Sequence, residues 1–433
     1  MVELERLNNN FNIPNGTVYL VGGAVRDELL GLPVTEKDWL VVGVNPETML
    51  EQGFITVGKD FPVFLHPETK EEYALARTER KTAVGYHGFQ FHTSPEVTLE
   101  DDLIRRDLTI NAIAKDAQGR IIDPFQGQQD LDRKILRHVS DAFIEDPVRI
   151  LRIARFAARF AHLGFTIADE TLALMKQMVA RGEVDALIAE RIFKEFNRAL
   201  TEKSPEVFIQ ILRDCGALKV IFPEIDNLFG IPNPPLWHPE IDTGIHSLMV
   251  LQQCARISGD ASVRFAALCH DLGKAKTPKN HWPSHKGHEK AGVPIIKELC
   301  QRIKAPKSWC ELASLSSEFH LHCHRLMEMK PETIVKTLEK LDAFRRPERF
   351  EQFLVTCEAD FKGRLGWENK HYPQRKQFSQ LRETASTIDT KTIVQNCQNP
   401  ADIAQQIYRA RVQAVKEEKQ QLINNLDVEY HTP

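Results

Sequence analysis

The sequence predicts an α+β fold, in which a head with a small N-terminal sheet is followed by an all-α body. Short apolar runs typical of strands gather before residue 80, and helical patterns dominate after about residue 140. The composition, with 42% hydrophobic and 27% charged residues, is that of an ordinary globular chain. It excludes disordered, collagen-like and disulfide-rich small proteins, and 433 residues suffice for about three domains.

The expected elements begin after a short lead-in at residues 1–16. Residues 17–23 are predicted as a buried strand that ends in two glycines, residues 24–31 as a short helix, and residues 38–44 as a second apolar strand. Three more strands are expected at residues 54–59, 62–66 and 71–77.

The body is expected to consist of helices. Residues 145–165 have a strong helical pattern, and the closely spaced prolines within 233–235 mark a boundary because they cannot continue a helix. The C-terminal part is amphipathic and carries mixed charges. Helices are therefore predicted from about residue 140 to the end.

Composition also narrows the compartment and the partners. No apolar run approaches the roughly 18 residues that a membrane helix needs, so we expect no membrane contact. The mixed-charge N-terminus lacks the apolar core of a signal peptide. A net charge of −4 argues against a globally basic nucleic-acid binder but allows local basic patches. Eight cysteines without a closely spaced pair are typical of reduced thiols in a cytoplasmic protein.

Residues around the first strand suit the binding of phosphate groups. Gly22 and Gly23 let the backbone approach a phosphate, and the helix that follows offers unpaired N–H groups. Arg26, one turn into this helix, is expected to hold a phosphate oxygen. Two glycines alone usually mark only a turn, so the signal depends on their combination with the arginine and the acids that follow.

Carboxylates follow at a spacing that suits divalent metal ions. On a strand, Glu36 and Asp38 share one face because side chains alternate. Two carboxylates beside a phosphate site can hold two ions for an in-line phosphoryl displacement, and Glu72 on a later strand is a third candidate ligand. The alternative is an exposed strand end that binds no metal.

These residues form a segment that resembles the signature of class II nucleotidyltransferases, which include bacterial tRNA nucleotidyltransferases (CCA-adding enzymes) and poly(A) polymerases. The similarity runs from about residue 17 to beyond residue 360. It implies a polymerase-β-like head that binds Mg²⁺, with Gly22, Gly23 and Arg26 holding the triphosphate of CTP or ATP.

A second motif supports this resemblance. Arg105-Arg106-Asp107 followed by Asn111 is similar to the family's ribose-selecting element. The resemblance implies that Asp107 and Asn111 sense the ribose and that Arg106 contacts the nucleotide or primer. Residues 76–89 occupy the place of the family's flexible loop.

A third motif, from Glu145 to Arg149, suggests how the base is selected. Cytosine and adenine both present an exocyclic amine beside a bare ring nitrogen, so a carboxylate accepts from the amine while an arginine donates to the nitrogen. Uracil and guanine present the reversed pattern. An Asp146–Arg149 pair on one helix face is therefore expected to accept C and A and to reject U and G. On its own, the motif would more often be a solvated ion pair.

Four arginines, Arg149, Arg152, Arg155 and Arg159, fall within an arc of about 120° on a helix. One interpretation is a solvated basic face. The resemblance implies instead that Arg152 and Arg155 contact the triphosphate or the primer, and a basic face also suits the phosphates of RNA.

One position departs from the family pattern, because Glu36 stands where an aspartate is usual. Glutamate still offers a hard oxygen ligand, but it is one methylene longer, and Mg²⁺ demands tight octahedral geometry. We expect Glu36 to ligate the metal with some loss of rate or a shifted preference between Mg²⁺ and Mn²⁺.

A second constellation of histidines and aspartates lies in the latter half of the chain. His246, the step His270-Asp271 and Asp360 resemble the HD phosphohydrolase motif, in which a bound metal activates water. Imidazole and carboxylate ligands suit Ni, Co, Mn or Zn better than Ca. We expect these four residues to ligate a transition metal, with Ni²⁺ as the expected ion and His270 and Asp271 as catalytic residues.

The remaining histidines give a weaker pattern. His285 and His288 are left open as ligands. His320, His322 and His324 lack a matching second half, so they are expected to be structural or peripheral.

The resemblance implies a CCA-adding enzyme with a fused HD domain, whose partner is tRNA and which is a monomer or homodimer. The HD domain would supply 2′,3′-cyclic phosphodiesterase, 2′-nucleotidase and phosphatase activities for tRNA end repair. The alternatives are a poly(A) polymerase, a CC-adding enzyme, or an HD phosphohydrolase with an RNA-binding but inactive head. The expected segments are a lead-in at 1–16, a nucleotidyltransferase head at 17–140, a helical neck at 141–232, an HD domain at 233–345 and a helical tail at 346–433.

Overall fold

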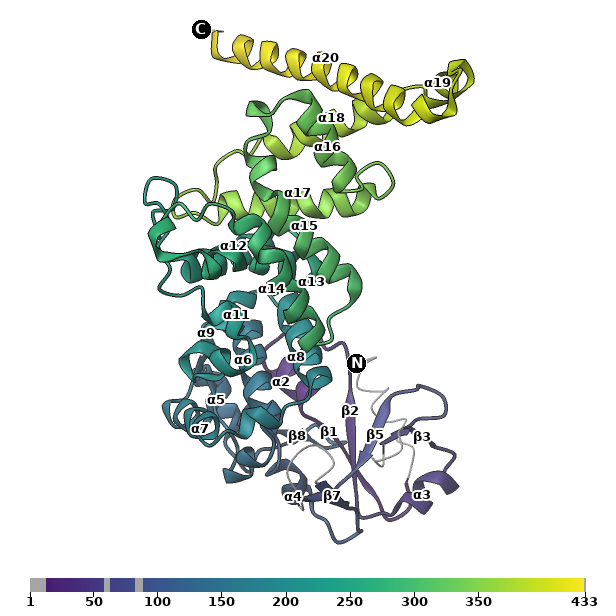
Figure 1. Cartoon of the computed structure of the whole chain (residues 1–433). Coiled ribbons are helices and arrows are strands. Elements are labelled where there is room, and N and C mark those ends of the chain that lie inside the picture. Colours follow the sequence, from purple (N-terminus) through teal and green to yellow (C-terminus); the bar gives the residue numbers. More distant parts are fainter. Residues whose placement is uncertain (1–12, 58–62, 82–88, 432–433) are drawn as a thin grey trace. The chain divides into compact units, whose positions relative to one another are not determined.

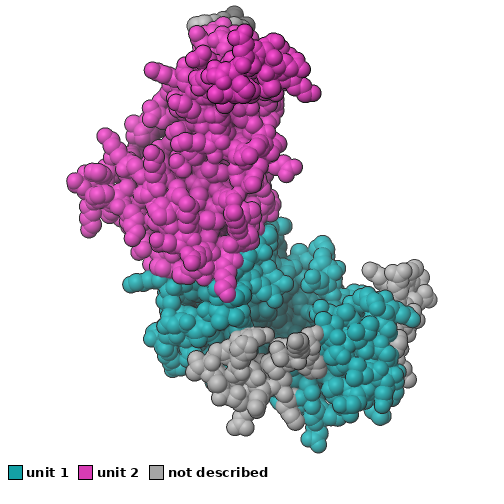
Figure 2. Space-filling model, turned by 45° about the vertical axis from the view of Figure 1, so that its right-hand side comes forward, with its two compact units in different colours: residues 1–221 teal, residues 222–433 magenta. Residues whose placement is uncertain are grey.

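A computed structural model describes residues 13–57, 63–81 and 89–431 of the chain. The chain divides into two compact units, Met1–Ile221 and Phe222–Pro433 (Figure 1 and Figure 2). Unit 1 contains a mixed sheet and helices, and the described part of unit 2 is helical. The predicted α+β class is therefore confirmed.

The sheet of unit 1 has seven strands in the order β3-β4-β5-β2-β1-β8-β9. At its middle, β1 (Thr17–Val21) pairs antiparallel with β2 (Asp38–Val42), which pairs in parallel with β5 (Glu72–Leu75). These three strands lie side by side in Figure 1. The outer strands are β3 (Ile55–Val57), β4 (Val63–Leu65), β8 (Ala114–Lys115) and β9 (Ile121–Ile122).

Both faces of the sheet are covered by apolar side chains, which explains the unbroken apolar runs of its central strands. Leu40 belongs to a buried cluster with Val21, whereas its neighbour Val41 belongs to the opposite cluster with Phe64. Asp38 is the first residue of β2, where the apolar part of the strand ends. The sheet core thus fixes the backbone beside this carboxylate.

The segment expected to be a flexible loop contains a hairpin. β6 (Thr78–Lys81) pairs antiparallel with β7 (Phe89–His92). The rest of the predicted loop, residues 82–88, lies outside the described residues. The segment that occupies the place of the family's flexible loop therefore includes paired strands where it is described.

The helices of unit 1 follow the sheet and its short helices. α2 (Gly23–Leu29) begins directly after β1, and α6 (Val148–Phe160) packs against α8 (Ala189–Thr201) and α9 (Pro205–Asp214). α6 begins after Pro147, which suits a helix start because proline lacks the N–H that would be unpaired there. The remaining helices are α3 (Pro46–Glu51), α4 (Leu99–Leu103), α5 (Gly127–Arg133), α7 (Asp169–Ala180) and α10 (Ala217–Ile221).

Unit 2 is built around five helices that pack on one another. They are α12 (Thr243–Ile257), α13 (Ala261–Cys269), α14 (His288–Arg302), α15 (Lys307–His324) and α17 (Pro347–Lys362). α12 and α13 are each capped by an aspartate, Asp242 and Asp260, whose carboxylate accepts from a backbone N–H of the first turn. The others are α11 (Pro223–Asp226), α16 (Pro331–Lys340), α18 (Gln374–Ser386), α19 (Thr390–Asn396) and α20 (Ile403–His431).

Two further observations concern the chain as a whole. Among the described helices, none combines the length and the apolar character that crossing a bilayer requires. All eight cysteines are free thiols, and six of them are buried.

Candidate active sites

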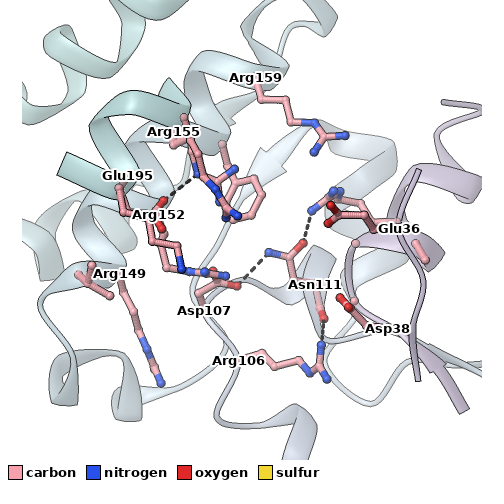
Figure 3. A pocket seen from close by; sticks show the side chains of 18 of the residues that line it. Glu36, Asp38, Arg106, Asp107, Asn111, Arg149, Arg152, Arg155, Arg159 and Glu195 are labelled. Carbon is pink, nitrogen blue, oxygen red and sulfur yellow. Dashed lines mark hydrogen bonds and ion pairs between the residues drawn. The ribbon is translucent and has the colours of Figure 1, made fainter. Parts of the chain in front are cut away.

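Unit 1 contains a cleft of about 900 Å³. Its lining includes eleven arginine or lysine side chains and six aspartates or glutamates. Figure 3 shows the arginines of α6 on one side of this cleft and the carboxylates of Glu36 and Asp38 on the opposite side. Cationic walls that face carboxylates suit a polyanionic ligand that brings its own metal ions.

The two glycines predicted to approach a phosphate line this cleft. Gly22 has a φ of 68°, and a Cβ atom there would lie 2.7 Å from Nη1 of Arg106. Gly23 starts α2, whereas Arg26 is buried and donates to Asn111 Oδ1 at 2.5 Å and to Asp27 Oδ1 at 2.9 Å. The donors of Arg26 thus bind Asp27 and Asn111 at the floor of the cleft. Its contact with a phosphate stays a prediction.

The paired acids are arranged differently from the prediction. Asp38 opens β2, but Glu36 lies before the strand, so the two do not share a strand face. Glu72 is the register partner of Asp38 on the parallel neighbour β5, although it does not line the cleft. Both Glu36 and Asp38 are exposed and line it.

The electrostatics of Asp38 favour a nearby cation. Partial burial in the cleft wall raises the pKa of its carboxyl, Arg106 lowers this pKa, and the neighbouring Glu36 raises it. Glu36, Asp38 and Glu72 are not among the described groups whose ligand atoms all lie within 4.8 Å of one another. Two hard carboxylates nevertheless meet at one wall, and this donor set fits Mg²⁺.

A chain of hydrogen bonds runs along the cleft floor (Figure 3). Arg152 Nε donates to Asp107 Oδ2 at 2.7 Å, Asn111 Nδ2 donates to Asp107 Oδ1 at 2.9 Å, and Arg26 donates to Asn111. Burial alone would raise the pKa of Asp107, but Arg152 and the hydrogen bond from Asn111 lower it well below its usual range. Asp107 is therefore a carboxylate that joins the head to α6.

The α6 arginines line the same cleft, as their spacing predicted. Two of them also tie α6 to its neighbours, because Arg155 Nε donates to the buried Glu195 on α8 at 2.8 Å and Arg159 Nη2 donates to Asp27 at 2.8 Å. Arg106 is held by Asp102, at 3.1 Å. These side chains have partners within the protein, which favours a cleft wall over a solvated basic face.

Asp146 and Arg149, which are expected to bind the base together, both line the cleft, although Asp146 precedes α6 and does not lie on its face. Arg191 of α8 binds both carboxylate oxygens of Asp146, at 3.0 and 2.7 Å. Arg149 instead donates to the backbone carbonyls of Ala142 and Arg105, at 2.9 and 2.7 Å. A bidentate arginine fork is a stronger partner for a carboxylate than a neighbour whose own donors already have acceptors.

Sequence reasoning missed one wall of the cleft. Arg191, Lys194, Glu195 and Arg198 of α8 line it, and their spacing of three, four and seven residues puts them on one helix face. This spacing is the signal that would have found them. It matches no short motif, so only the packing of α8 on α6 shows its relevance.

Unit 2 contains the second site, where histidines and aspartates from separate helices meet. His246 Nε2 lies 3.2 Å from Asp360 Oδ1, and His270 Nε2 lies 3.1 Å from Asp271 Oδ2 and 3.7 Å from Asp360 Oδ1. All four residues are buried. The structure thus brings together the four predicted metal ligands.

The buried carboxylates of this site favour the binding of a cation. Burial alone would lower the pKa of His270, but the carboxylates of Asp271 and Asp360 raise it to about 9. Lys274 approaches Asp271 Oδ2 at 2.6 Å. Asp271 Oδ1 is buried and accepts no hydrogen bond from a described residue, which is an unusual state for a carboxylate. Buried imidazole nitrogens and carboxylate oxygens fit a transition metal.

The histidines left open or dismissed are placed differently from the predictions. The described hydrogen bonds of the His285 ring go to Thr277 Oγ1 and to the carbonyl of Pro232, outside the cluster. His320, expected to be peripheral, lies 3.9 Å from Asp271 Oδ1, and His288 lies 3.3 Å from it. His324 contacts Asp360 Oδ2 at 2.6 Å. The spacing of His320 and His324 in the sequence does not show that they lie beside the cluster, because their partners are more than 30 residues distant in sequence.

A further layer orients these ligands. Glu240 lies 2.9 Å from Nδ1 of both His238 and His246. Burial lowers the pKa of His238 to about 4, although the hydrogen bond that its ring donates to Glu240 raises this pKa. A carboxylate behind a metal-ligating histidine fixes the ring and makes it a better ligand. No short sequence motif predicts this pair.

Comparisons with known families agree with both sites. A family model described as the Poly A polymerase head domain matches residues 18–137, and the HD domain matches residues 243–346. A third model, described as a probable RNA and SrmB-binding site of polymerase A, matches residues 164–229.

Curated relatives are similar over nearly the whole chain. The chain is 59% identical over 401 residues to the Multifunctional CCA protein of Thioalkalivibrio sulfidiphilus, covering 93% of this chain and 98% of the relative. It is 58% identical to the Multifunctional CCA protein of Teredinibacter turnerae, covering 92% and 97%.

Solved structures share the fold at low identity. A CCA-adding enzyme in complex with CTP has a TM-score of 0.65 at 20% identity, covering 100% of this chain and 96% of that one. The Thermotoga maritima CCA-adding enzyme in complex with tRNA has a TM-score of 0.62 at 19% identity, covering 98% and 95%.

Proposed function

The chain belongs to the family of multifunctional CCA proteins, and we propose that it adds C, C and A to the 3′ end of tRNA from CTP and ATP, without a nucleic-acid template. It has a nucleotidyltransferase head and an HD domain. The observation that carries the proposal is the cleft of unit 1, where cationic side chains face two carboxylates across about 900 Å³. This volume suits a nucleotide.

Glu36 and Asp38 would hold Mg²⁺ in this cleft. When bound, the ions lower the pKa of the attacking hydroxyl and neutralise charge on the phosphates. Arg106 and Arg152 would hold the triphosphate, since both line the cleft and carry planar guanidinium groups that suit phosphate oxygens. The 3′ oxygen of the tRNA bonds to the α-phosphorus as the bond to pyrophosphate breaks, and the hydroxyl proton is lost.

Base selection is assigned to Asp146 and Arg149, with a change of partners. Asp146 would leave Arg191 to accept from the amine of C or A, while Arg149 donates to the adjacent ring nitrogen. Both residues line the cleft and lie three positions apart at the start of α6, which supports the assignment. Asp107 and Asn111 would sense the ribose from the cleft floor.

A tRNA substrate is supported by the relatives' names and by the solved complex of a CCA-adding enzyme with tRNA. Recognition by shape and phosphate contacts suits the arginine-rich walls of the cleft. Cytoplasmic localisation and the oligomeric state, monomer or homodimer, stay predictions.

The experiment uses tRNA that lacks its 3′ end, with Mg²⁺ and with CTP and ATP separately or together. Three added nucleotides with both substrates, and two with CTP alone, are expected. A long A tail would show a poly(A) polymerase, and two nucleotides with both substrates would show a CC-adding enzyme. No addition, in Mn²⁺ as well, would leave the HD site as the active one.

We further propose that the HD site has 2′,3′-cyclic phosphodiesterase, 2′-nucleotidase and phosphatase activities for the repair of tRNA ends. His246, His270, Asp271 and Asp360 would hold the metal, for which we propose Ni²⁺. Such an ion activates water to attack phosphorus. Damaged ends carry cyclic or terminal phosphates that block extension, and their removal restores the hydroxyl that the head extends.

The double variant His270→Ala with Asp271→Ala tests this second activity. Hydrolysis of a 2′,3′-cyclic nucleotide should fall below detection, while CTP incorporation stays unchanged because the cleft lies in unit 1. Loss of both activities would contradict two separate sites, and unchanged hydrolysis would remove the cluster from the reaction.

A further inference from the structure

The segment that follows α17 carries an arginine that reaches the edge of the histidine–aspartate cluster. Arg364 lies four residues after Asp360, and its Nη2 atom is 4.0 Å from Asp360 Oδ1. This oxygen faces the Nε2 atoms of His246 and His270, at 3.2 and 3.7 Å. Because 4.0 Å is too long for a hydrogen bond, the guanidinium lies beside the cluster without binding it.

Close packing on α12 fixes where this segment leaves α17. The helix ends at Lys362, and a Cβ atom on Gly363 would lie 2.7 Å from the Cα atom of Val250 and 2.4 Å from its Cγ2 atom. Val250 follows His246 by one turn of α12. Only glycine allows such an approach, so the backbone that carries Arg364 is held next to the cluster.

Two aromatic rings support the guanidinium. The Cζ atom of Arg364 lies 5.1 Å from the centre of the Trp367 ring and 5.7 Å from that of Phe361. The two rings contact each other, with centroids 4.9 Å apart. The backbone N–H of Trp367 donates to the carbonyl of Arg364 at 2.9 Å, which closes the turn between them. An arginine stacked in this way is oriented before a ligand binds.

Arg364 lies in the cleft wall of this site with hydrogen-bonding capacity to spare. Its Nε atom is buried without a hydrogen-bond partner among the described residues, and the side chain is only 12% exposed. Lys274 offers the contrast, because its ammonium contacts Asp271 Oδ2 at 2.6 Å and donates to Asn233 at 3.0 Å. A cation that only neutralised Asp360 would be expected to bind it as closely as Lys274 binds Asp271. The donors of Arg364 therefore suit an anion that comes from outside the protein.

We propose that Arg364 binds the phosphate group of the substrate at the cluster of unit 2. The inference deepens the proposed phosphohydrolase activity and rests on it for its purpose. A guanidinium is planar and matches two phosphate oxygens at once, which an ammonium does not. Its charge stabilises these oxygens while water attacks phosphorus.

The test measures phosphate binding apart from hydrolysis. Every protein is full length and carries Glu36→Ala and Asp38→Ala, which remove the proposed metal ligands of the head. Each is loaded with Mn²⁺, freed of excess ion by gel filtration and titrated with inorganic phosphate. Mn²⁺ broadens the ³¹P resonance of a phosphate that binds beside it. A further His270→Ala with Asp271→Ala should abolish this broadening, because the ion in unit 2 is lost.

Arg364→Ala should weaken the binding of phosphate about tenfold, because charge-assisted hydrogen bonds are lost. Arg364→Lys keeps the charge without the planar fork and should weaken it about threefold. Arg345→Ala is the matched control, since Arg345 lies two residues before α17, as Arg364 lies two residues after it. The Arg345 side chain is 84% exposed and pairs with Asp342, so its loss should leave phosphate binding unchanged.

Arg364→Gln serves as a second variant that keeps a polar side chain, in case the alanine variant disturbs the end of α17. Circular dichroism of each variant checks its helix content, and the amount of bound Mn²⁺ checks the cluster. Both should match the parent chain, because Arg364 is not a metal ligand.

The outcomes separate this inference from the proposed activity, which is assayed as hydrolysis of a 2′,3′-cyclic nucleotide by the chain with an intact head. Unchanged phosphate affinity in Arg364→Ala and Arg364→Gln would overturn the inference. A loss of bound Mn²⁺ from both variants would overturn it as well, since Arg364 would then support the cluster itself. Weaker phosphate binding in the variants, without hydrolysis by the chain with an intact head, would uphold the phosphate contact and contradict the activity. Hydrolysis with unchanged phosphate affinity would do the reverse.

Discussion

The two sites hold their functional side chains in different ways. In the cleft of unit 1, the carboxylates of Asp107 and Asp146 are held by the side chains of Arg152 and Arg191, whereas Arg149 donates to backbone carbonyls. In unit 2, His270 and His288 are anchored by backbone carbonyls of their own turns. A side-chain partner can be exchanged for a ligand, whereas a backbone anchor stays in place.

This difference suits the two tasks. An enzyme that accepts C and then A must let its selecting groups change partners, and the ion pairs of the cleft supply stable resting partners for each charge. A metal centre must keep its ligands in one geometry through every turnover. The cleft is therefore expected to respond strongly to single charge changes, and the metal centre to loss of a ligand.

The largest effect is expected from Asp38→Ala, which tests whether the sites work independently. Removal of this cleft carboxylate should lower CTP incorporation about 1000-fold, or ~4 kcal/mol in activation free energy, because a metal ligand is lost. Hydrolysis of a 2′,3′-cyclic nucleotide should not change. Glu68→Ala, exposed and outside the cleft, is the matched control for both assays. A parallel loss of hydrolysis would contradict independence.

Asp107→Asn tests how much stability the side-chain anchors of the cleft supply. The substitution breaks the ion pair between the buried Asp107 and the partly exposed Arg152. We therefore expect the free energy of unfolding of unit 1 to fall by about 2 kcal/mol at pH 7. The pKa of Asp107 is lowered in the folded state. Its carboxylate therefore stabilises the fold above the unfolded pKa of about 4, and this contribution falls as the pH drops below it.

Calorimetry of both proteins between pH 7 and pH 3 checks this expectation. The gap between the unfolding temperatures of wild type and Asp107→Asn should narrow below about pH 4. Asp132→Asn, at an exposed position of α5, should unfold like the wild type at every pH. A gap that widens with acid would show that Asp107 is protonated in the fold.

Asp146→Asn sharpens the idea that the selecting groups exchange partners. An amide both donates and accepts, so it no longer distinguishes the amine of cytosine from the carbonyl of uracil. The preference for CTP over UTP should fall about tenfold, measured as the ratio of incorporation efficiencies. Arg191→Gln keeps the carboxylate but weakens its resting partner, and it should keep the preference. An equal loss in both variants would make the Asp146–Arg191 pair structural.

The smallest effect is expected from Glu36→Asp. Restoring the shorter acid should raise the rate in Mg²⁺ by a few-fold at most and change the ratio of the rates in Mg²⁺ and Mn²⁺, since Mg²⁺ is the stricter ion in geometry. Incorporation of CTP measured in each metal checks it. Unchanged incorporation by Glu36→Ala would remove Glu36 from the metal site.

The sequence predicted those features that depend on local pattern. The strands at Thr17–Val21 and Asp38–Val42 lie where short continuous apolar runs predicted them, and the helix Val148–Phe160 lies where a helical pattern did. The predicted metal ligands His246, His270, Asp271 and Asp360 meet in one cluster, because each stands in or next to a motif. These predictions needed no knowledge of packing.

What the sequence did not predict depends on which helices lie against each other. Arg191 binds the carboxylate of Asp146 because α8 packs on α6. His320 and His324 reach the cluster because α15 packs on α14 and α17. No short motif contains these pairs, so the local pattern indicated only structural or peripheral roles for both histidines.

The backbone anchors of the metal centre have a consequence for how its sequence can change during evolution. The carbonyls that hold His270, His288 and His320 come from residues three or four positions earlier in each case. The orientation of each ring is thus fixed by a hydrogen bond within a single turn of the chain. During evolution, core residues between these helices can therefore be replaced while the cluster is kept. One residue inserted within such a turn would instead rotate the ring away from the cluster, and the site would be lost.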